Sequence, residues 1–283
     1  MASAAAPLKE VVTAARRILM CRPTHFQVTY SINPWMDMNQ KVNRPKAMQQ
    51  WETLRQTLEN CGAQVDVMEA NGAENYPDMV FSANAAVIKG HRAYLANFTF
   101  PERKGERYFF EQWFTKHGYE CVGDLDIAFE GAGDALWGGA GHRTLFTGVG
   151  PRTDVRALKD LTEKLNDGTP FKVMGCRLVD PRFYHIDTAF CPLNDELAMY
   201  FPHAFDPITR HNMHNETGLL PVSEKEAQNF ACNAVVVGRN VVMNHRNDEI
   251  ANKLEKLGFS VKFVDMSEFI KSGGSAKCCT LAI

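Results

Sequence analysis

The chain has 283 residues, of which 45% are hydrophobic and 23% charged, and its net charge is −2. This composition is ordinary for a globular protein with a sizeable core. It excludes nucleic acid and anionic membrane surfaces as partners, because both require a concentrated block of basic residues. No apolar run approaches the roughly 18 residues that span a bilayer.

Eight cysteines are present, without a CxxC pair or zinc-finger spacing, so we expect neither a metal site nor an organic cofactor. The start of the chain lacks a secretory signal pattern, which predicts free thiols in a reducing, cytoplasmic compartment. Arg16 and Arg17 follow an apolar start and leave a mitochondrial location open. We expect residues 1–16 to be an N-terminal extension and residues 17–283 to form a single domain.

The first elements predicted after the extension are a strand, a helix and a second strand. Residues 18–22 form the first strand and residues 64–68 the second. Between them, Trp51, Leu54 and Leu58 recur at helical spacing, which predicts a helix over residues 46–61.

Four β-hairpins are predicted next, each as two apolar runs around a turn. They span residues 80–98, 135–149, 188–200 and 234–243, with turns at 89–91, 138–142, 193–195 and 238–240. Because the turns lie roughly fifty residues apart, the pattern is typical of a repeat architecture.

Each hairpin precedes a helix and then a short strand, so the repeating unit is β-β-α-β. The helices are predicted at residues 106–117, 155–165 and 248–257, and the strands at 120–122, 172–178 and 259–264. The third unit is less regular, because its helical segment 206–212 contains Pro207 and its strand position contains Pro221.

The two ends of the chain complete the pattern. Residues 278–283 form one unpaired apolar strand, and an exposed strand edge at each end is unfavourable unless the two pair. Pairing them produces a fifth unit and closes a ring. We therefore predict a five-bladed α/β propeller, a pentein, closed by its own termini. An ordinary open α/β sheet is the alternative.

Polar residues recur at one position of the repeat, at or just before the first strand of each unit. They are Asn84, Glu130 with Asp134, His185 with Asp187, Asn229 with Asn233, and Cys278. Each has a structural explanation alone, as a capping amide, a core histidine or an inert buried thiol. Because they occupy the same position in successive repeats, we expect them to converge in one polar pocket on the ring axis. Such a pocket is the usual location of an active site.

The residue types in this pocket point to attack on a cationic carbon. A thiol beside an imidazole forms a thiolate and an imidazolium, and carboxylates hold a planar cation. Cys278 would attack a guanidino carbon, His185 would protonate the departing amine, and water would hydrolyse the adduct. Gly273 and Gly274 allow a tight loop before the thiol, and Cys279 faces the core on the opposite side of the strand.

These residues lie in motifs that resemble the guanidino-group-modifying superfamily, which includes arginine deiminases, dimethylarginine dimethylaminohydrolases and amidinotransferases, all pentein propellers. The resemblance runs from Met20 to the C-terminus. The motifs are PDMVFSAN (77–84), PER (101–103), FEGAGDAL (129–136), PRTD (151–154), FYHIDTAF (183–190) and GGSAKC (273–278).

The resemblance implies a role for each matching residue. Cys278 corresponds to the nucleophile, His185 to the general acid and base, and Glu130 to the acid that orients the histidine. The implied substrate ligands are Asp187 for the guanidinium, Asp78 for the α-amino group, and Arg103 with Arg152 for the α-carboxylate. Asn233 is a further expected substrate ligand.

Two departures distinguish this chain within the superfamily. The EGAGD motif is one residue longer than the usual EGGD type, which leaves the role of Asp134 open. Asn84 stands where deiminases and dimethylarginine hydrolases carry Asp. SINPWM (31–36), SAN (82–84) and NFACN (229–233) look most similar to arginine dihydrolases, which convert arginine to ornithine through citrulline.

A carboxamide both donates and accepts hydrogen bonds, so Asn84 suits a neutral urea as well as a guanidinium, and Asn33 adds a second amide. We therefore expect arginine, a small molecule, as substrate. A dimethylarginine dimethylaminohydrolase and a one-step arginine deiminase remain alternatives, as does a non-catalytic arginine sensor. The sequence leaves the oligomeric state open, a homo-oligomer included.

Overall fold

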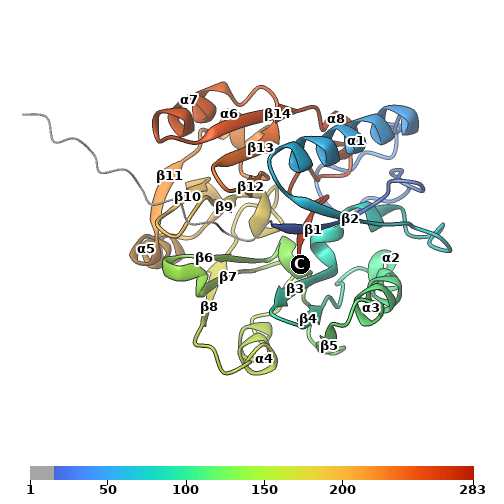
Figure 1. Cartoon of the computed structure of the whole chain (residues 1–283), viewed down its shortest axis with the longest axis horizontal. Coiled ribbons are helices and arrows are strands. Elements are labelled where there is room, and N and C mark those ends of the chain that lie inside the picture. The colour runs from blue at the N-terminus through green and yellow to red at the C-terminus, as the bar shows by residue number, and fades with distance from the viewer. Residues whose placement is uncertain (1–15) are drawn as a thin grey trace, which may run out of the picture.

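The structure, a computed structural model, describes residues 16–283, so residues 1–15 of the expected N-terminal extension lie outside the described residues. Five three-stranded sheets are arranged in a ring, with helices on the outside (Figure 1). In every sheet the middle strand pairs antiparallel with one neighbour and parallel with the other. The predicted five-bladed α/β propeller is confirmed.

The first sheet joins the two ends of the described chain. Strand β1 (Arg17–Cys21) pairs in parallel with β2 (Gln64–Met68) and antiparallel with β15 (Leu281–Ala282). Helix α1 (Arg44–Asn60) connects β1 to β2 and begins at Asn43, whose side chain accepts a hydrogen bond from the backbone N–H of Lys46. The C-terminus accordingly lies near the middle of the view in Figure 1, next to β1.

The second and third sheets follow the predicted β-β-α-β order. The second contains β3 (Ala86–Lys89), β4 (Arg92–Leu95), helices α2 (Pro101–Lys104) and α3 (Glu106–Lys116), and β5 (Glu120–Val122). The third contains β6 (Ala135–Gly138), β7 (Thr144–Val149), α4 (Ala157–Lys164) and β8 (Lys172–Arg177).

The last two sheets repeat that order. The fourth contains β9 (Phe190–Pro192), β10 (Leu197–Tyr200), α5 (Pro207–Glu216) and β11 (Gly218–Pro221). The fifth contains β12 (Val235–Val237), β13 (Asn240–Asn244), α7 (Asp248–Lys256) and β14 (Ser260–Val264). Short helices α6 (Glu224–Gln228) and α8 (Ser267–Ile270) lie in the connections.

The two prolines that made the third repeat look irregular fit its regular elements. Pro207 lies in the first turn of α5, where a missing N–H costs nothing, and Asp206 caps this turn. Pro221 is the last residue of β11, an edge strand, where proline is tolerated.

Two predicted strand segments are wrong. Residues 80–85 mostly form two single-turn helices, Pro77–Val80 and Ser82–Ala85, and residues 278–280 form a turn before β15. Local bonds replace strand pairing there: the N–H of Asn84 donates to the carbonyl of Phe81, and that of Thr280 to Lys277. The predicted alternation of Cys278 and Cys279 along a strand therefore does not apply, although Cys279 is fully buried.

No helix between residues 16 and 283 has both the length and the apolar character needed to cross a membrane.

Candidate active site

Single turns hold the polar residues at one end of the ring axis. Asn84 lies in the turn before β3, Glu130 begins the Gly131–Gly133 turn before β6, and His185 begins the Ile186–Thr188 turn before β9. Asn233 and Cys278 occupy the equivalent turns before β12 and β15. All five side chains are at most 2% exposed. The backbone N–H and C=O groups of each turn form hydrogen bonds within or close to the turn. The side chains are therefore free to point towards the ring axis.

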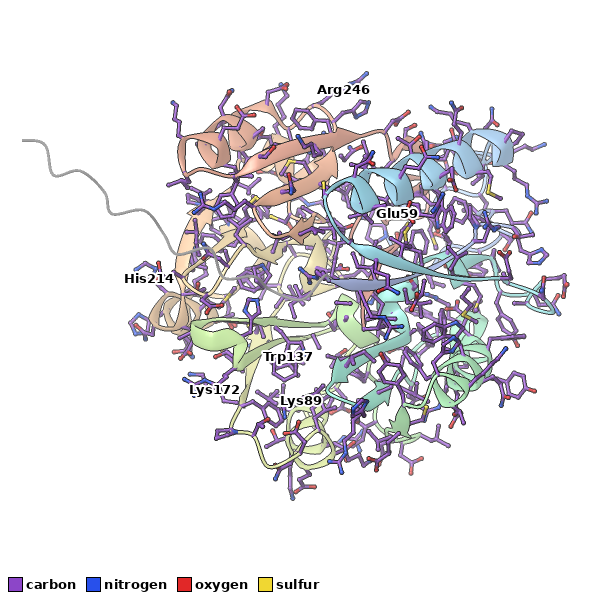
Figure 2. The ribbon with its side chains drawn as sticks, viewed as in Figure 1. Glu59, Lys89, Trp137, Lys172, His214 and Arg246 are labelled. Atoms are coloured by element: carbon purple, nitrogen blue, oxygen red, sulfur yellow. The ribbon has the colours of Figure 1, made fainter. Side chains whose placement is uncertain are left out.

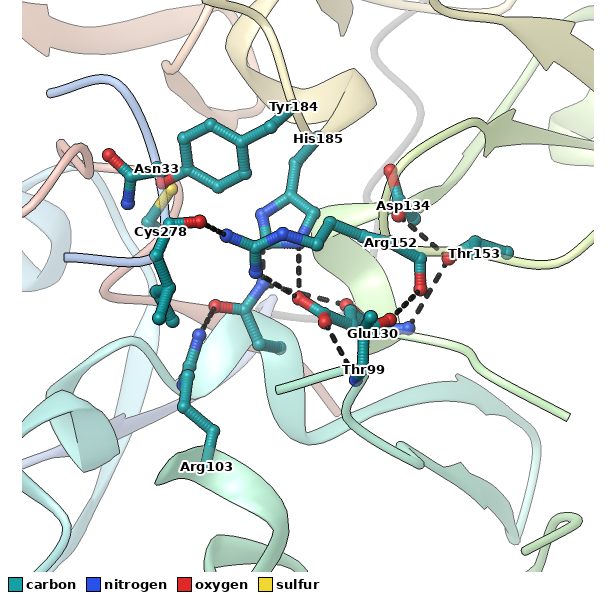
Figure 3. Close-up of polar contacts among 12 residues, drawn as sticks. Asn33, Thr99, Arg103, Glu130, Asp134, Arg152, Thr153, Tyr184, His185 and Cys278 are labelled. Carbon is teal, nitrogen blue, oxygen red and sulfur yellow. Dashed lines mark hydrogen bonds and ion pairs between the residues drawn. The ribbon is translucent and has the colours of Figure 1, made fainter. Parts of the chain in front are cut away.

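Glu130 lies at the meeting point of His185, Arg152 and Thr99 (Figure 3). Its carboxylate is 2.7 Å from Nε2 of His185 and accepts from Nη1 of Arg152 at 2.8 Å and from the N–H of Thr99 at 3.1 Å. Burial alone would raise the pKa of Glu130, but Arg152 and His185 together lower it to about 2. The ionised Glu130 therefore accepts a proton-bearing Nε2, which leaves Nδ1 of His185 for chemistry.

Asn84 faces that second ring nitrogen. Its Nδ2 lies 3.5 Å from Nδ1 of His185 and 3.5 Å from the carbonyl oxygen of Glu130, while its Oδ1 accepts from Nη1 of Arg103 at 2.9 Å. Because Arg103 has only donors, it fixes which end of the amide points at the histidine. Arg103 is itself held by Glu106, which accepts from Nε at 2.8 Å and from Nη2 at 2.9 Å.

The thiol of Cys278 has different partners from those expected. Its Sγ lies 3.4 Å from Oδ2 of Asp187 and accepts from Nδ2 of Asn233 at 3.1 Å, whereas both ring nitrogens of His185 face other groups. Burial and the negative charge of Asp187 raise the pKa of the Cys278 thiol. The resting site is therefore a protonated thiol against a carboxylate, and the expected thiolate–imidazolium pair is not found.

Asp187 is a buried carboxylate without a cationic partner. Its side chain is 0% exposed, and no Lys, Arg or His nitrogen within residues 16–283 lies within 4.0 Å of it. Burial raises its pKa to about 6, against the opposing field of Lys277. The other buried carboxylates differ, since Glu130 pairs with Arg152 and Glu106 with Arg103. A carboxylate left unpaired in this position favours a bound cation next to the thiol.

Asn233 stabilises the turn that carries Cys278. Its Oδ1 accepts from the N–H groups of Ser275 and Cys278, each at 3.1 Å, and its Nδ2 donates to the carbonyl of Asp187 and to Sγ of Cys278. Both ends of the amide are thus occupied inside the protein. This arrangement fixes the turn that carries Cys278 to the neighbouring blade.

The space between these residues is a cavity of about 10 Å³. Such a volume holds about one water molecule. Six of the ten predicted site residues line it, namely Asn33, Asp78, Asn84, Arg103, Arg152 and Cys278. The other four, Glu130, His185, Asp187 and Asn233, hydrogen-bond to members of this group.

The segment 30–36 closes this cavity. Tyr30 donates to Asp78 at 2.9 Å, and the carbonyl of Ile32 accepts from Nη2 of Arg152 at 2.7 Å. Asn33 donates to the carbonyl of Ser272 at 3.1 Å. An amino acid therefore enters only if this segment moves.

Arg152 and Asp78 complete the lining of the cavity. The guanidinium of Arg152 lies between the rings of Phe100 and Tyr184, 4.6 and 4.7 Å from their centroids. Asp78 also accepts from Oγ of Ser272 at 3.0 Å, and burial raises its pKa despite the charge of Arg103. A carboxyl group so placed can accept from an amino group.

Glu106 and Asp134 support the site in ways that sequence reasoning missed. The spacing of three residues between Arg103 and Glu106 was the available signal for their ion pair. Asp134, whose role was open, accepts from Oγ1 of Thr153 at 2.7 Å and from the N–H of Ile186 at 3.1 Å. It therefore holds the turn that carries His185.

Among residues 16–283, no group of three or more His, Cys, Asp or Glu side chains is arranged to hold a metal ion.

Comparison with known proteins assigns the chain to a family. The sequence profile of the eukaryotic N,N-dimethylarginine dimethylhydrolase family matches residues 22–283. The chain therefore belongs to this family.

Relatives of two activities are similarly close. The chain is 42% identical over 275 residues to the bifunctional arginine dihydrolase/ornithine cyclodeaminase ArgZ of Synechocystis, covering 94% of this chain but 37% of ArgZ. It is 41% identical to the N(G),N(G)-dimethylarginine dimethylaminohydrolase of Mycobacterium tuberculosis, covering 95% of this chain and 86% of that protein.

A solved structure shows the same fold. The substrate-bound N-terminal domain of cyanobacterial ArgZ superposes with a TM-score of 0.88 at 38% identity, covering 94% of this chain and 97% of that one. The chain spans about two fifths of the full length of ArgZ, so it corresponds to one part of that bifunctional protein. The hydrolases in this group act on guanidino C–N bonds.

Proposed function

We propose that this chain is an arginine dihydrolase that converts free arginine and two waters to ornithine, carbon dioxide and two ammonia through citrulline. The observation that carries the proposal is Asn84, an amide fixed by Arg103 so that its Nδ2 faces the catalytic centre. The similarity to the dihydrolase part of ArgZ supports the same reaction.

The unpaired carboxylate of Asp187 binds the guanidinium in this proposal, which brings the electrophilic carbon to Sγ of Cys278. At the other end of the substrate, Asp78 accepts from the α-amino group, and Arg152 and Arg103 attract the α-carboxylate. Arg103 contributes mainly charge, because its Nε and Nη2 already bond to Glu106 and its Nη1 to Asn84.

The bound cation activates the thiol. In the resting site Asp187 raises the pKa of the Cys278 thiol, and a guanidinium between them offsets that negative charge. The thiol then passes its proton to Nδ1 of His185, and the thiolate attacks the guanidino carbon. His185 gives a proton to the departing amine, ammonia leaves, and a thiouronium remains on Cys278.

Water completes the first half of the reaction. Nδ1 of His185 accepts a proton from the attacking water, while Glu130 stabilises the charge that forms on the ring. The C–S bond then breaks and citrulline is formed. A second attack by Cys278 on the neutral ureido carbon, followed by a second water, releases ornithine, carbon dioxide and ammonia.

Asn84 accounts for the second round. An aspartate at this position would accept but not donate, and would repel the carbonyl oxygen that develops on a urea. The Nδ2 of Asn84 can donate to that oxygen, and Asn33 in the closing segment offers a second amide. Retention of citrulline thus depends on amides rather than on carboxylates alone.

Dimethylarginine dimethylaminohydrolase activity is the second candidate. The matching family profile and the 41% identical mycobacterial relative favour it. Its products would be citrulline and dimethylamine, formed by one round of the same chemistry at Cys278.

We further propose that residues 17–283 form one catalytic domain and that the protein works in the cytoplasm. The eight cysteines, all free thiols, support a reducing compartment. A homo-oligomer remains a prediction that a measurement of molar mass in solution tests.

A substrate panel tests the proposal. The protein is incubated separately with arginine, citrulline and asymmetric dimethylarginine, and products are identified by mass spectrometry. We expect ornithine from arginine and no turnover in the Cys278→Ser variant. Consumption of dimethylarginine but not arginine would show that the protein is a dimethylarginine dimethylaminohydrolase. Unchanged turnover in Cys278→Ser would refute Cys278 as nucleophile.

A further inference from the structure

A second, much larger cavity lies on the ring axis. Its volume is about 780 Å³, within the range of small-molecule sites. All five sheets line it through the edge strands β3, β6, β9, β12 and β15. It contains none of the ten predicted site residues.

The cavity extends from the hairpin turns towards the back of the active site. At the hairpin end it is lined by Lys89, His142, Asp195 and Gly238. At the other end it reaches Lys277 and Thr280, in the turn that carries Cys278. Lys89 and Trp137, labelled in Figure 2, belong to neighbouring blades, and the indole N–H of Trp137 donates to the carbonyl of Ile88 at 2.9 Å.

The walls between these two ends are apolar. They are formed by Ile18, Val87, Leu136, Phe190, Val236 and Leu281. An apolar wall of this depth is suited to a hydrocarbon chain rather than to a polar metabolite.

The charges along the cavity are unbalanced. At the rim His142 pairs with Asp195 at 3.2 Å, and Lys89 pairs with Asp167. Asp195 is the one carboxylate among the described lining residues. Lys277, at the inner end, has no carboxylate within 4.0 Å among residues 16–283, and its Nζ donates only to the carbonyl of Thr280, at 3.4 Å.

Arg16 adds a second cation to the inner wall. Its guanidinium donates to the carbonyl of Val236 and to no described carboxylate. Burial lowers the pKa of Lys277, because a charged ammonium there is poorly solvated, although the more distant negative charge of Asp187 opposes this shift. An ammonium so placed gains from an anion that brings its own charge to the inner end.

We propose that the axial cavity is a binding site for an amphipathic carboxylate with an unbranched apolar chain. Its carboxylate pairs with Lys277 at the inner end, and its chain lies along Val87, Leu136 and Phe190 towards the hairpin turns. A neutral chain would leave Lys277 unpaired, and a cationic one would be repelled by it.

Calorimetry on the full chain with decanoate tests this site. The comparison ligands are decan-1-ol, decyltrimethylammonium and acetate, all below their aggregation limits. We expect one equivalent of decanoate to bind at least about tenfold more tightly than any of them, since only decanoate has both chain and anion.

Two variants locate the bound molecule. Lys277→Met removes the cation and is expected to weaken decanoate binding at least about tenfold, whereas Lys256→Met on the exposed face of α7 leaves it unchanged. Ala282→Trp, at an exposed position of β15, fills the cavity and is expected to abolish binding.

Circular dichroism tests whether each variant is folded. If Lys277→Met does not fold, decanoate binding to Ala282→Trp alone tests the location of the site. Equal binding of decanoate, the alcohol and the cation would overturn the proposal. Wild-type affinity in both Lys277→Met and Ala282→Trp would overturn it as well. Because resting protein is titrated without arginine, the result is independent of the proposed hydrolase activity.

Discussion

In the proposed reaction, Cys278 and Asp187 determine when the site becomes reactive. The thiol lies 3.4 Å from a carboxylate that has no cation within 4.0 Å among residues 16–283, so both groups are in an unfavourable environment until a guanidinium binds. The arrangement makes the substrate part of the activation. A free thiol held protonated in this way is also poorly nucleophilic towards other reagents.

The first prediction concerns the cost of keeping Asp187 charged. Because its folded pKa is raised from 3.8 to about 6, the folded state binds its proton more tightly than the unfolded state does. The destabilisation is therefore absent below pH 4, grows between pH 4 and 6, and is complete above pH 6. Asp187→Asn should raise the free energy of unfolding at pH 8 by up to about 3 kcal/mol and abolish turnover.

Urea denaturation of both proteins at pH 8 and pH 4 measures this difference. The exposed Asp126→Asn is the matched control and should change stability little at either pH. A gain of the same size at pH 4 and pH 8 would show that the carboxylate charge is not its cause.

The second prediction concerns Asn84. In Asn84→Asp the new carboxylate pairs with Arg103 and no longer donates to a ureido oxygen. The variant should release citrulline and form at least about tenfold less ornithine per arginine consumed. Chromatographic quantification of both amino acids over time measures the ratio, and a wild-type ratio would refute the role of the amide.

Shared phase in the repeat predicted that Asn84, Glu130, His185, Asp187, Asn233 and Cys278 gather at one end of the axis, because equivalent positions of a closed ring converge. The other four site residues were predicted only by the family resemblance. It did not predict which of them touch. That His185 bonds to Glu130 and Asn84, while Cys278 bonds to Asp187 and Asn233, depends on side-chain directions that a spacing of fifty residues does not contain.

At the scale of elements, hairpins were predictable because glycines mark three of the four turns and Asn194-Asp195 marks the fourth. Gly90 and Gly238 both have positive φ, at 57° and 58°, where glycine is favoured. The turns before the first strands were not predictable in this way. Residues 80–85 are apolar enough to resemble a strand, and only the closed ring makes the chain turn there to present Asn84.

The ion pair between α2 and α3 yields a third prediction. Glu106 is 0% exposed, and burial raises its pKa to about 7 although Arg103 opposes the shift. Glu106→Gln leaves the buried charge of Arg103 without its partner and should cost about 3 kcal/mol or more of unfolding free energy. Arg103 would also hold Asn84 less firmly, so the fraction of arginine that reaches ornithine should fall.

Glu111→Gln is the matched control on the same helix, because no side-chain hydrogen bond of Glu111 is found within residues 16–283. Urea denaturation and product ratios are measured for both variants. Equal stability of Glu106→Gln and Glu111→Gln would contradict a structural role for the ion pair.

At the scale of the whole molecule, the ring is closed by two residue pairs, Ile18 with Ala282 and Leu19 with Leu281. The pairing of the two ends was predictable because each offered an unpaired apolar strand. The short length of β15 was not predictable, because residues 278–280 form the turn that directs the thiol of Cys278 towards the axis.

Closure yields a fourth prediction. Leu281 is 1% exposed, so Leu281→Ala removes core contacts from the closing strand and should cost about 2–5 kcal/mol of unfolding free energy. Activity should fall with it, because Cys278 lies three residues earlier. Ile283→Ala, at a partly exposed position beyond the strand, should cost much less by the same denaturation measurement. Equal losses would argue against closure through β15.

The fate of the guanidino carbon distinguishes one round of hydrolysis from two. Arginine labelled with ¹³C at this carbon is incubated with the protein and followed by carbon NMR and an ammonia assay. We expect the label to pass through citrulline to bicarbonate, with two ammonia released for each ornithine. Label that accumulates in citrulline with one ammonia for each arginine consumed would contradict it.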